Sequence, residues 1–124
     1  AMIGYVTLGV TDLEKAKAFY STLLADLGAK ELMATDRLVM LGKSTDAPMI
    51  AICIPYDQKD PHPGNGNMVA LDPGSKERVD ELYQKALDLG ATCEGKPGDR
   101  VPGVFYGAYV RDPDGNKLAF YQFS

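Results

Sequence analysis

With 124 residues, the chain has the length of one ordinary domain and can bury a sizeable apolar core without disulfides. Its formal net charge of -4 argues against a nucleic-acid-binding surface, and its 13 Lys and Arg residues are dispersed along the sequence. No apolar run approaches the roughly 18 residues of a membrane span and no signal-peptide pattern is present, so we expect a cytoplasmic protein with no membrane or nucleic-acid partner.

The first half of the chain predicts a strand, a helix and three further strands. Residues 3–10 alternate in polarity and are rich in β-formers, which is typical of a strand. Thr11 or Asp12 is placed to cap a helix over residues 13–24, where apolar side chains recur near a helical period. Three short strand candidates follow, at residues 31–34, 37–41 and 49–54.

The second half repeats this order after a Pro-, Gly- and Asp-rich connector at residues 55–66. A strand is predicted at residues 67–72, and the Pro-Gly-Ser sequence that follows it caps a helix over residues 76–89. Three further strands are predicted at residues 92–95, 105–111 and 117–123.

The last two predicted strands flank a turn sequence, Asp-Pro-Asp-Gly-Asn at residues 112–116. Centring the turn near Asp114 places Tyr109 across from Ala119, so one face of the hairpin carries Tyr109, Ala119 and Tyr121. The opposite face carries plain core residues, which are Val110, Leu118 and Phe120. A small Ala between two tyrosines either receives another element or leaves a cavity.

The two halves match as an internal repeat. Tyr20 and Tyr83 lie 63 residues apart in the two predicted helices, and the glycines that end these helices, Gly28 and Gly90, lie 62 apart. Carried back by 63 residues, the core faces of the two first strands also superimpose. We therefore predict two copies of a β-α-β-β-β unit.

Two motifs carry a resemblance to a known superfamily: VTDLEKAKAFY at residues 10–20, after the first strand, and RDPDGNK at residues 111–117, before the last. The Pro-Gly-Asn-Gly lead-in at residues 63–66 and the Lys-Pro-Gly-Asp-Arg loop at residues 96–100 are similar as well. In this order and spacing, the duplicated unit resembles the vicinal oxygen chelate superfamily, over essentially the whole chain. That superfamily includes glyoxalase I, extradiol dioxygenases, bleomycin-resistance proteins and fosfomycin-resistance enzymes.

The fold that we expect is α+β, with two β-α-β-β-β units forming curled mixed sheets around a cleft and the helices outside. We expect one domain over residues 2–124, with units at about 2–55 and 66–124 and a connector at 56–65. Ala1 before Met2 is interpreted as a residue left by tag removal and has no part in the fold.

The resemblance implies where a divalent metal would normally be held. In that superfamily His and Glu ligands come from the first and last strands of each unit, and these positions fall here at Tyr5, at or beside Met68, and at Ala119, with a fourth within residues 49–54. None is a good ligand for a hard divalent ion. The chain also has a single histidine, His62 in the connector, so one chain cannot supply a two-His-one-carboxylate site, and we expect no metal and no cofactor.

The face opposite the helix-packing residues is the predicted ligand site. It mixes hydroxyl groups with a soft Met and two Ala, which is typical of a small-molecule pocket, although a filled second core is the alternative. The candidate ligand-binding residues are Tyr5, Thr7, Met68, Ala70, Tyr109, Ala119 and Tyr121.

Other chemistry-bearing residues have simpler explanations. Asp57, Asp60 and His62 lack a recognisable metal-ligand spacing, and we expect a solvated loop. Cys53 and Cys93 lack a Cys-x-x-Cys spacing and are expected to be reduced thiols, not a redox pair or a catalytic nucleophile. Three arginines could hold an anionic ligand or lie at strand ends on the surface, namely Arg37, Arg100 and Arg111.

The sequence thus favours a metal-free protein, akin to the bleomycin-resistance type, that sequesters a small, largely apolar or aromatic molecule in a tyrosine-lined cleft. The catalytic residues, if any, are not predicted. The alternative is a metal-dependent lyase or dioxygenase of the same superfamily with unconventional ligands, or an enzyme with a tyrosine acid or base and no metal. A third possibility is a closed cleft in a subunit that binds a protein partner. A homodimer is also expected, because short sheets have edges to cover.

Overall fold

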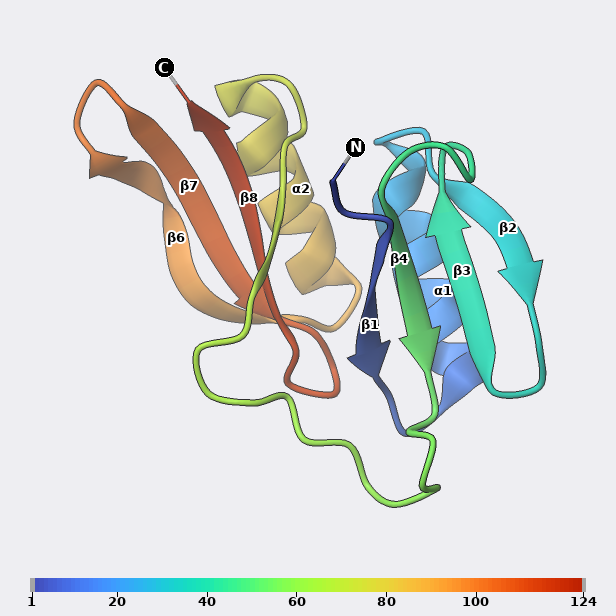
Figure 1. Cartoon of the computed structure of the whole chain (residues 1–124). Coiled ribbons are helices and arrows are strands. Elements are labelled where there is room, and N and C mark those ends of the chain that lie inside the picture. Colours follow the sequence, from blue (N-terminus) through green and yellow to red (C-terminus); the bar gives the residue numbers. More distant parts are fainter. Residues whose placement is uncertain (1, 124) are drawn as a thin grey trace. The chain divides into compact units, whose positions relative to one another are not determined.

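The computed structural model describes residues 2–123, and Figure 1 shows the elements in chain order. They are β1 (Tyr5–Gly9), α1 (Leu13–Ala25), β2 (Lys30–Ala34), β3 (Leu38–Gly42), β4 (Met49–Cys53), β5 (Val69–Leu71), α2 (Lys76–Asp88), β6 (Thr92–Val101), β7 (Phe105–Arg111) and β8 (Lys117–Phe123). The chain divides between Pro63 and Gly64 into two compact units, each with one β-α-β-β-β set. The predicted α+β class is confirmed.

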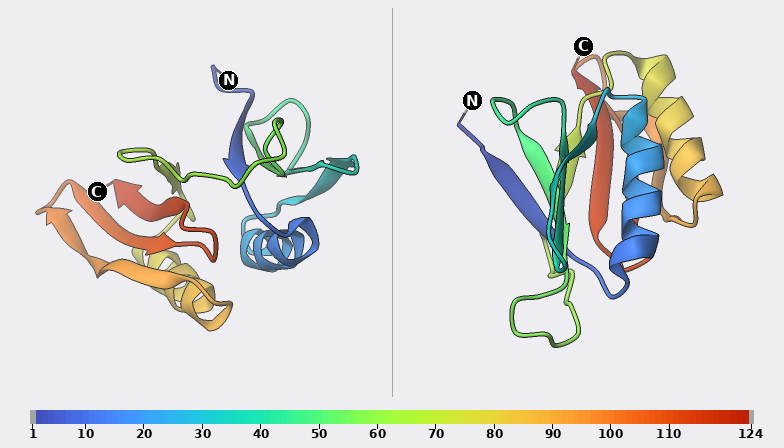
Figure 2. Two further views of the ribbon diagram at one scale, coloured as in Figure 1. Left: turned by 90° about the horizontal axis from the view of Figure 1, so that it is seen from below. Right: turned by 90° about the vertical axis from the view of Figure 1, so that its right-hand side faces the viewer.

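The two units share one strand order. The first sheet runs β1-β4-β3-β2 and the second β5-β8-β7-β6, so the first strand of each unit lies beside its last strand. That pair is parallel in both sheets, and the other pairs are antiparallel. The shared order confirms the internal repeat, and neither sheet closes into a barrel. Figure 2 shows each helix lying along one face of its own sheet.

The core of each unit lies between its sheet and its helix. Alternation in the strands sends branched and aromatic side chains to the helix side. In the first unit the buried residues include Val39, Leu41, Ile50 and Ile52 of the sheet and Phe19, Tyr20, Leu23 and Leu24 of α1. In the second they include Val110, Leu118 and Phe120, the predicted core face, with Val79, Leu82 and Ala86 of α2. Within residues 2–123, no helix is long and apolar enough to cross a membrane.

Each helix begins with a side-chain cap. Asp12, rather than Thr11, caps α1, because its carboxylate accepts a hydrogen bond from the amide of Lys15 at 3.1 Å. Ser75 caps α2 in the same way, with its hydroxyl accepting from the amide of Arg78 at 3.3 Å. The two caps occupy equivalent places in the two units.

One strand differs from the sequence prediction. The strand predicted at residues 92–95 extends to Val101, so the predicted Lys-Pro-Gly-Asp-Arg loop lies within β6. The strand reaches this length through register shifts between Cys93 and Gly95 and twice more along its course. Pro97 has no backbone N–H, but β6 is an edge strand, so this position needs no hydrogen bond to a further strand. Glycines are common at such bulges because they tolerate the altered backbone.

Candidate functional site

The first unit has a groove of about 590 Å³ on the side of its sheet away from α1. The register aligns Thr7 with Ala51 and Gly9 with Cys53, so alternate residues of β1 and β4 share this face. The groove is lined by Tyr5, Thr7, Gly9, Arg37, Leu38, Cys53, Pro55, Tyr56, Asp57, Asp60, Pro61 and His62. One wall is therefore the sheet, and the other is the connector that follows β4.

The connector is held against the sheet by specific contacts. The Arg37 guanidinium donates from Nη1 to the carbonyl oxygen of Ile54 at 2.9 Å, and its Cζ lies 5.4 Å from the ring centroid of Tyr56. A Cβ placed on Gly9 would come within 2.9 Å of the Cβ of Pro61. Only glycine at this position lets the connector approach β1 this closely, and that approach forms the groove.

The groove offers an apolar wall with a few polar groups. Tyr5 is 55% exposed, and Tyr5 and Thr7 line the groove from the same side of β1. Cys53 is a buried free thiol, whereas Cys93 is a free thiol exposed elsewhere, so both predicted thiols are unpaired. This mixture is what small-molecule pockets commonly show.

The helix-free face of the second unit carries the predicted hairpin residues. Tyr109 pairs with Ala119, as counted from the turn, and Ala119 pairs in turn with Ala70 of β5. Ala119 is fully buried among its neighbours, and we call the row of small residues Ala119 and Ala70 the floor of this face. Met68 precedes β5 and is 45% exposed.

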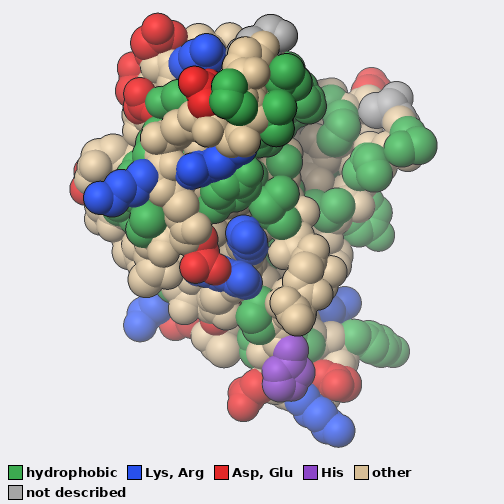
Figure 3. Space-filling view, turned by 90° about the vertical axis from the view of Figure 1, so that its left-hand side faces the viewer, with side chains coloured by type: hydrophobic (Ala, Val, Ile, Leu, Met, Phe, Trp, Pro, Cys, Tyr) green, Lys and Arg blue, Asp and Glu red, His purple; other side chains and the backbone are tan. Residues whose placement is uncertain are grey.

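Aromatic and basic side chains surround this floor. Tyr121 stacks on Phe105 with ring centroids 5.6 Å apart, and Phe123 packs edge-on against both rings. Arg100 and Lys117 lie near the ring of Tyr109. Figure 3 shows lysine and arginine side chains set beside hydrophobic ones on one side of the molecule.

The turn between β7 and β8 fixes the register of this face through a buried carboxylate. Asp112 accepts at Oδ1 from the amides of Asp114 (2.9 Å) and Asn116 (2.8 Å), and at Oδ2 from Nδ2 of Asn116 (3.0 Å). Gly115 supplies the positive φ of 92° that the turn requires.

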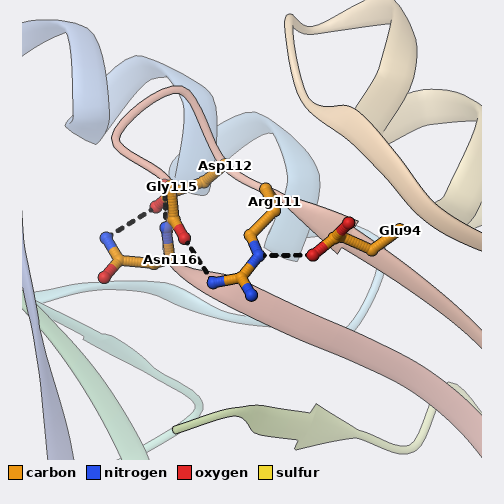
Figure 4. A network of polar contacts seen from close by, with 5 residues as sticks. All are labelled: Glu94, Arg111, Asp112, Gly115 and Asn116. Carbon is orange, nitrogen blue, oxygen red and sulfur yellow. Dashed lines mark hydrogen bonds and ion pairs between the residues drawn. The ribbon is translucent and has the colours of Figure 1, made fainter. Parts of the chain in front are cut away.

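Arg111 braces the same turn, as Figure 4 shows. It donates from Nη1 to the carbonyl oxygen of Gly115 at 2.9 Å and from Nε to Glu94 at 2.7 Å. The hydrogen bond from Arg111, and behind it the charges of Arg111 and Lys117, lower the pKa of the Glu94 carboxyl. Arg111 therefore has a structural role at the strand end.

The structure brings together some predicted site residues and adds others. Tyr5 and Thr7 lie together in the groove of the first unit. In the second unit Ala70, Ala119 and Tyr109 form one row, with Tyr121 two residues along β8. Sequence reasoning missed the contribution of Leu38, Cys53, Pro55, Tyr56 and Pro61 to the groove, and assigned Arg37 to the surface or a strand end. Strand alternation with Thr7 would have suggested Cys53, but the return of the connector leaves no periodic signal.

The residues at the superfamily's usual metal-ligand positions do not fit a hard divalent ion. Ala119 has no donor atom, and Met68 offers only a soft thioether. On β4, the residues that share a face with Thr7 are Met49, Ala51 and Cys53. Within residues 2–123, no three His, Cys, Asp or Glu side chains cluster closely enough to hold an ion, and this includes the groove-lining Asp57, Asp60 and His62.

The protein has a duplicated βαβββ fold. Each of its two open mixed sheets comes from one β-α-β-β-β unit and is covered by a helix on one face. The sequence profile of the Glyoxalase/Bleomycin resistance protein/Dioxygenase superfamily matches residues 2–120. The chain belongs to this superfamily, which confirms the resemblance seen in the two motifs.

Solved structures agree with this assignment. A glyoxalase/bleomycin resistance protein from Albidiferax ferrireducens T118 is 33% identical, with a TM-score of 0.87 and 98% of each chain covered. A family enzyme from Burkholderia phytofirmans PsJN is 22% identical, with a TM-score of 0.78 and 98% of each chain covered. FosX, a genomically encoded fosfomycin resistance protein from Listeria monocytogenes, is 22% identical, with a TM-score of 0.74 and coverage of 98% of this chain and 93% of its own. The last two share the fold alone. The comparison with curated proteins gave no significant match.

Proposed function

We propose that this protein binds a small, largely apolar or aromatic molecule against a helix-free sheet face and acts by sequestering it. The groove of the first unit carries the proposal, because its volume of about 590 Å³ lies in the range of about 300–1,000 Å³ typical of small-molecule sites. The residues proposed to bind a ligand are Tyr5 and Thr7 in the first unit and, on the corresponding face of the second unit, Met68, Ala70, Tyr109, Ala119 and Tyr121.

Apolar burial supplies most of the binding free energy. Covering roughly 200 Å² of an aromatic body contributes about 5 kcal/mol before the entropy cost of association. The affinity then depends on a few hydrogen bonds, and the proposed partners are the hydroxyls of Tyr5 and Thr7, two residues that line the groove.

The proposal is tested with the neutral fluorescent probe N-phenyl-1-naphthylamine, titrated into the full chain. Tyr5→Ala is expected to weaken saturable binding about tenfold, because it removes an aromatic wall. The matched control is Met33→Ala, which removes an exposed apolar side chain outside the groove, on β2. Absence of saturable binding, or equal losses in the two variants, contradicts the proposal.

We propose in addition that no metal ion is needed at the superfamily's usual positions, because Ala119 and Met68 supply no suitable donor. The alternative is a metal-dependent lyase or dioxygenase with unconventional ligands, although no three His, Cys, Asp or Glu side chains within residues 2–123 cluster closely enough to hold an ion. Elemental analysis of protein purified without chelator, followed by thermal shift with Ni, Zn, Mn and Fe(II), separates the two. One tightly held ion per chain overturns the metal-free proposal.

We also propose that the protein is a homodimer, since each four-stranded sheet has two edge strands that another chain can cover. Multi-angle light scattering at micromolar concentration is expected to give twice the chain mass. A single-chain mass across that range contradicts the proposal.

A further inference from the structure

Two cations flank one tyrosine on the helix-free face of the second unit. The Cζ of Arg100 lies 5.2 Å from the ring centroid of Tyr109, and the Nζ of Lys117 lies 5.3 Å from it. Lys117 is partly buried and lies two residues from Ala119 on β8, so its charge stands beside the floor of the face. The two side chains come from β6 and β8, on either side of β7.

Within residues 2–123, neither of these cations forms an ion pair. Arg100 donates to the carbonyl oxygen of Lys96, and the nearby carboxylate, Glu94, is bonded to Arg111. Asp99 lies on the opposite face of the sheet, because it pairs with Tyr106. The hydroxyl of Tyr106 donates a hydrogen bond to Asp80 of α2, which covers that face. This face therefore carries positive charge that the described residues leave unneutralised, in a chain whose formal net charge is -4.

The other end of the same face is aromatic. Along β8 the residues on this face are Lys117, Ala119, Tyr121 and Phe123, which run from cation to small residue to aromatic rings. Gly107 lies opposite Tyr121, and a Cβ there would meet the Phe105 ring at 2.9 Å, so the glycine makes room for that ring over the sheet. Lys117 and Tyr121 are four strand residues apart, or roughly 13 Å.

We propose that the helix-free face of the second unit, taken by itself, binds an aromatic anion, with its anionic group held by Arg100 and Lys117 beside Tyr109 and its planar body against Tyr121 and Phe105. This inference rests on the proposed function and adds the charge class of the ligand. A carboxylate, sulfonate or phosphonate on a ring system fits, because the cations lie within one small molecule's length of the aromatic rings. A neutral ligand would leave both cations without a counter-ion.

A pair of fluorescent probes tests the inference on the full chain. N-Phenyl-1-naphthylamine and 8-anilinonaphthalene-1-sulfonate share one ring system and differ by the sulfonate. The sulfonate probe is expected to bind at least about tenfold more tightly than the neutral probe. Lys117→Gln and Arg100→Gln are each expected to weaken binding of the sulfonate probe about tenfold. Both substitutions should change binding of the neutral probe less than about twofold. Raising the salt concentration should weaken binding of the sulfonate probe and leave binding of the neutral probe unchanged.

The matched control is Lys76→Gln. This substitution also removes a lysine that lies 5.6 Å from a tyrosine ring centroid, that of Tyr106, but on the α2 side of the same unit. It is expected to leave both affinities unchanged. Equal binding of the two probes, or equal losses in Lys117→Gln and Lys76→Gln, overturns the inference while leaving the proposed function standing. Failure of both probes to bind overturns the proposed function and this inference together.

Discussion

Replacing Asp112 by Ala tests whether one carboxylate sets the register of the β7–β8 hairpin. Asp112 is 4% exposed, and its carboxylate accepts hydrogen bonds from the backbone amides of Asp114 and Asn116 and from Nδ2 of Asn116. Each lost bond costs about 1 kcal/mol, and Asn116 is buried as well, so its amide finds no ready substitute in water. We expect Asp112→Ala to lower the free energy of unfolding by about 3 kcal/mol, or about 10 °C in Tm.

Two further variants make the comparison quantitative. Asp112→Asn keeps an oxygen for the two amides but loses the acceptor for Asn116 Nδ2, so we expect a loss of about 1 kcal/mol. Asp57→Ala makes the same chemical change at an exposed site, where the carboxylate accepts from the amide of Lys59 at 3.0 Å, and should cost at most about 0.5 kcal/mol.

The assay is urea and thermal denaturation followed by far-UV circular dichroism and tyrosine fluorescence, since the chain contains seven tyrosines and no tryptophan. The expected order of loss is Asp112→Ala, then Asp112→Asn, then Asp57→Ala. If Asp112→Ala costs no more than Asp57→Ala, the aromatic cluster of β7 and β8, and not the turn, sets the register.

Two further predictions concern the connector and the second helix. Gly9→Ala should cost about 1–3 kcal/mol and weaken N-phenyl-1-naphthylamine binding, because the new Cβ displaces Pro61, whereas Gly4→Ala, which meets nothing within 4 Å, should do neither. The hydrogen bond to Asp80, and after it burial, raises the pKa of Tyr106 from 10.0 to about 12. The protonated Tyr106 therefore stabilises the folded state fully below pH 10, and this contribution is lost as pH rises through 12. Thermal denaturation across that window should show a smaller fall for Tyr106→Phe than for the unchanged chain, and equal falls would refute the assignment.

The fold could be predicted from the sequence wherever a local motif marked a turn or the end of a helix. The turn residues at 112–116 fixed the register, and counting from them paired Tyr109 with Ala119 as observed. The repeat was accessible because Gly28 and Gly90 mark equivalent helix ends. The length of β6 could not be predicted, because Pro97 and the two glycines Gly95 and Gly98 are typical of a loop, and only a free sheet edge tolerates them in a strand.

Only one wall of the groove could be predicted from the sequence, for a different physical reason. Strand alternation places Tyr5 and Thr7 on the helix-free face, and the structure agrees. The opposing wall comes from a segment without periodicity, whose path depends on long-range contacts such as the one between Arg37 and the carbonyl oxygen of Ile54. Such contacts join residues 17 apart in the chain, and no pattern within a window of a few residues reports them.

The two units show how one repeated plan yields two different surfaces. In the first, Gly9 admits the connector, which turns an open sheet face into a groove rich in polar lining residues. In the second, Gly107 makes room for the ring of Phe105, and the face has an aromatic end and a basic end. Both differences depend on glycines that replace a side chain on the helix-free face. Substitutions at these glycines should therefore alter ligand binding more selectively than substitutions in the core between sheet and helix, which both units need for stability.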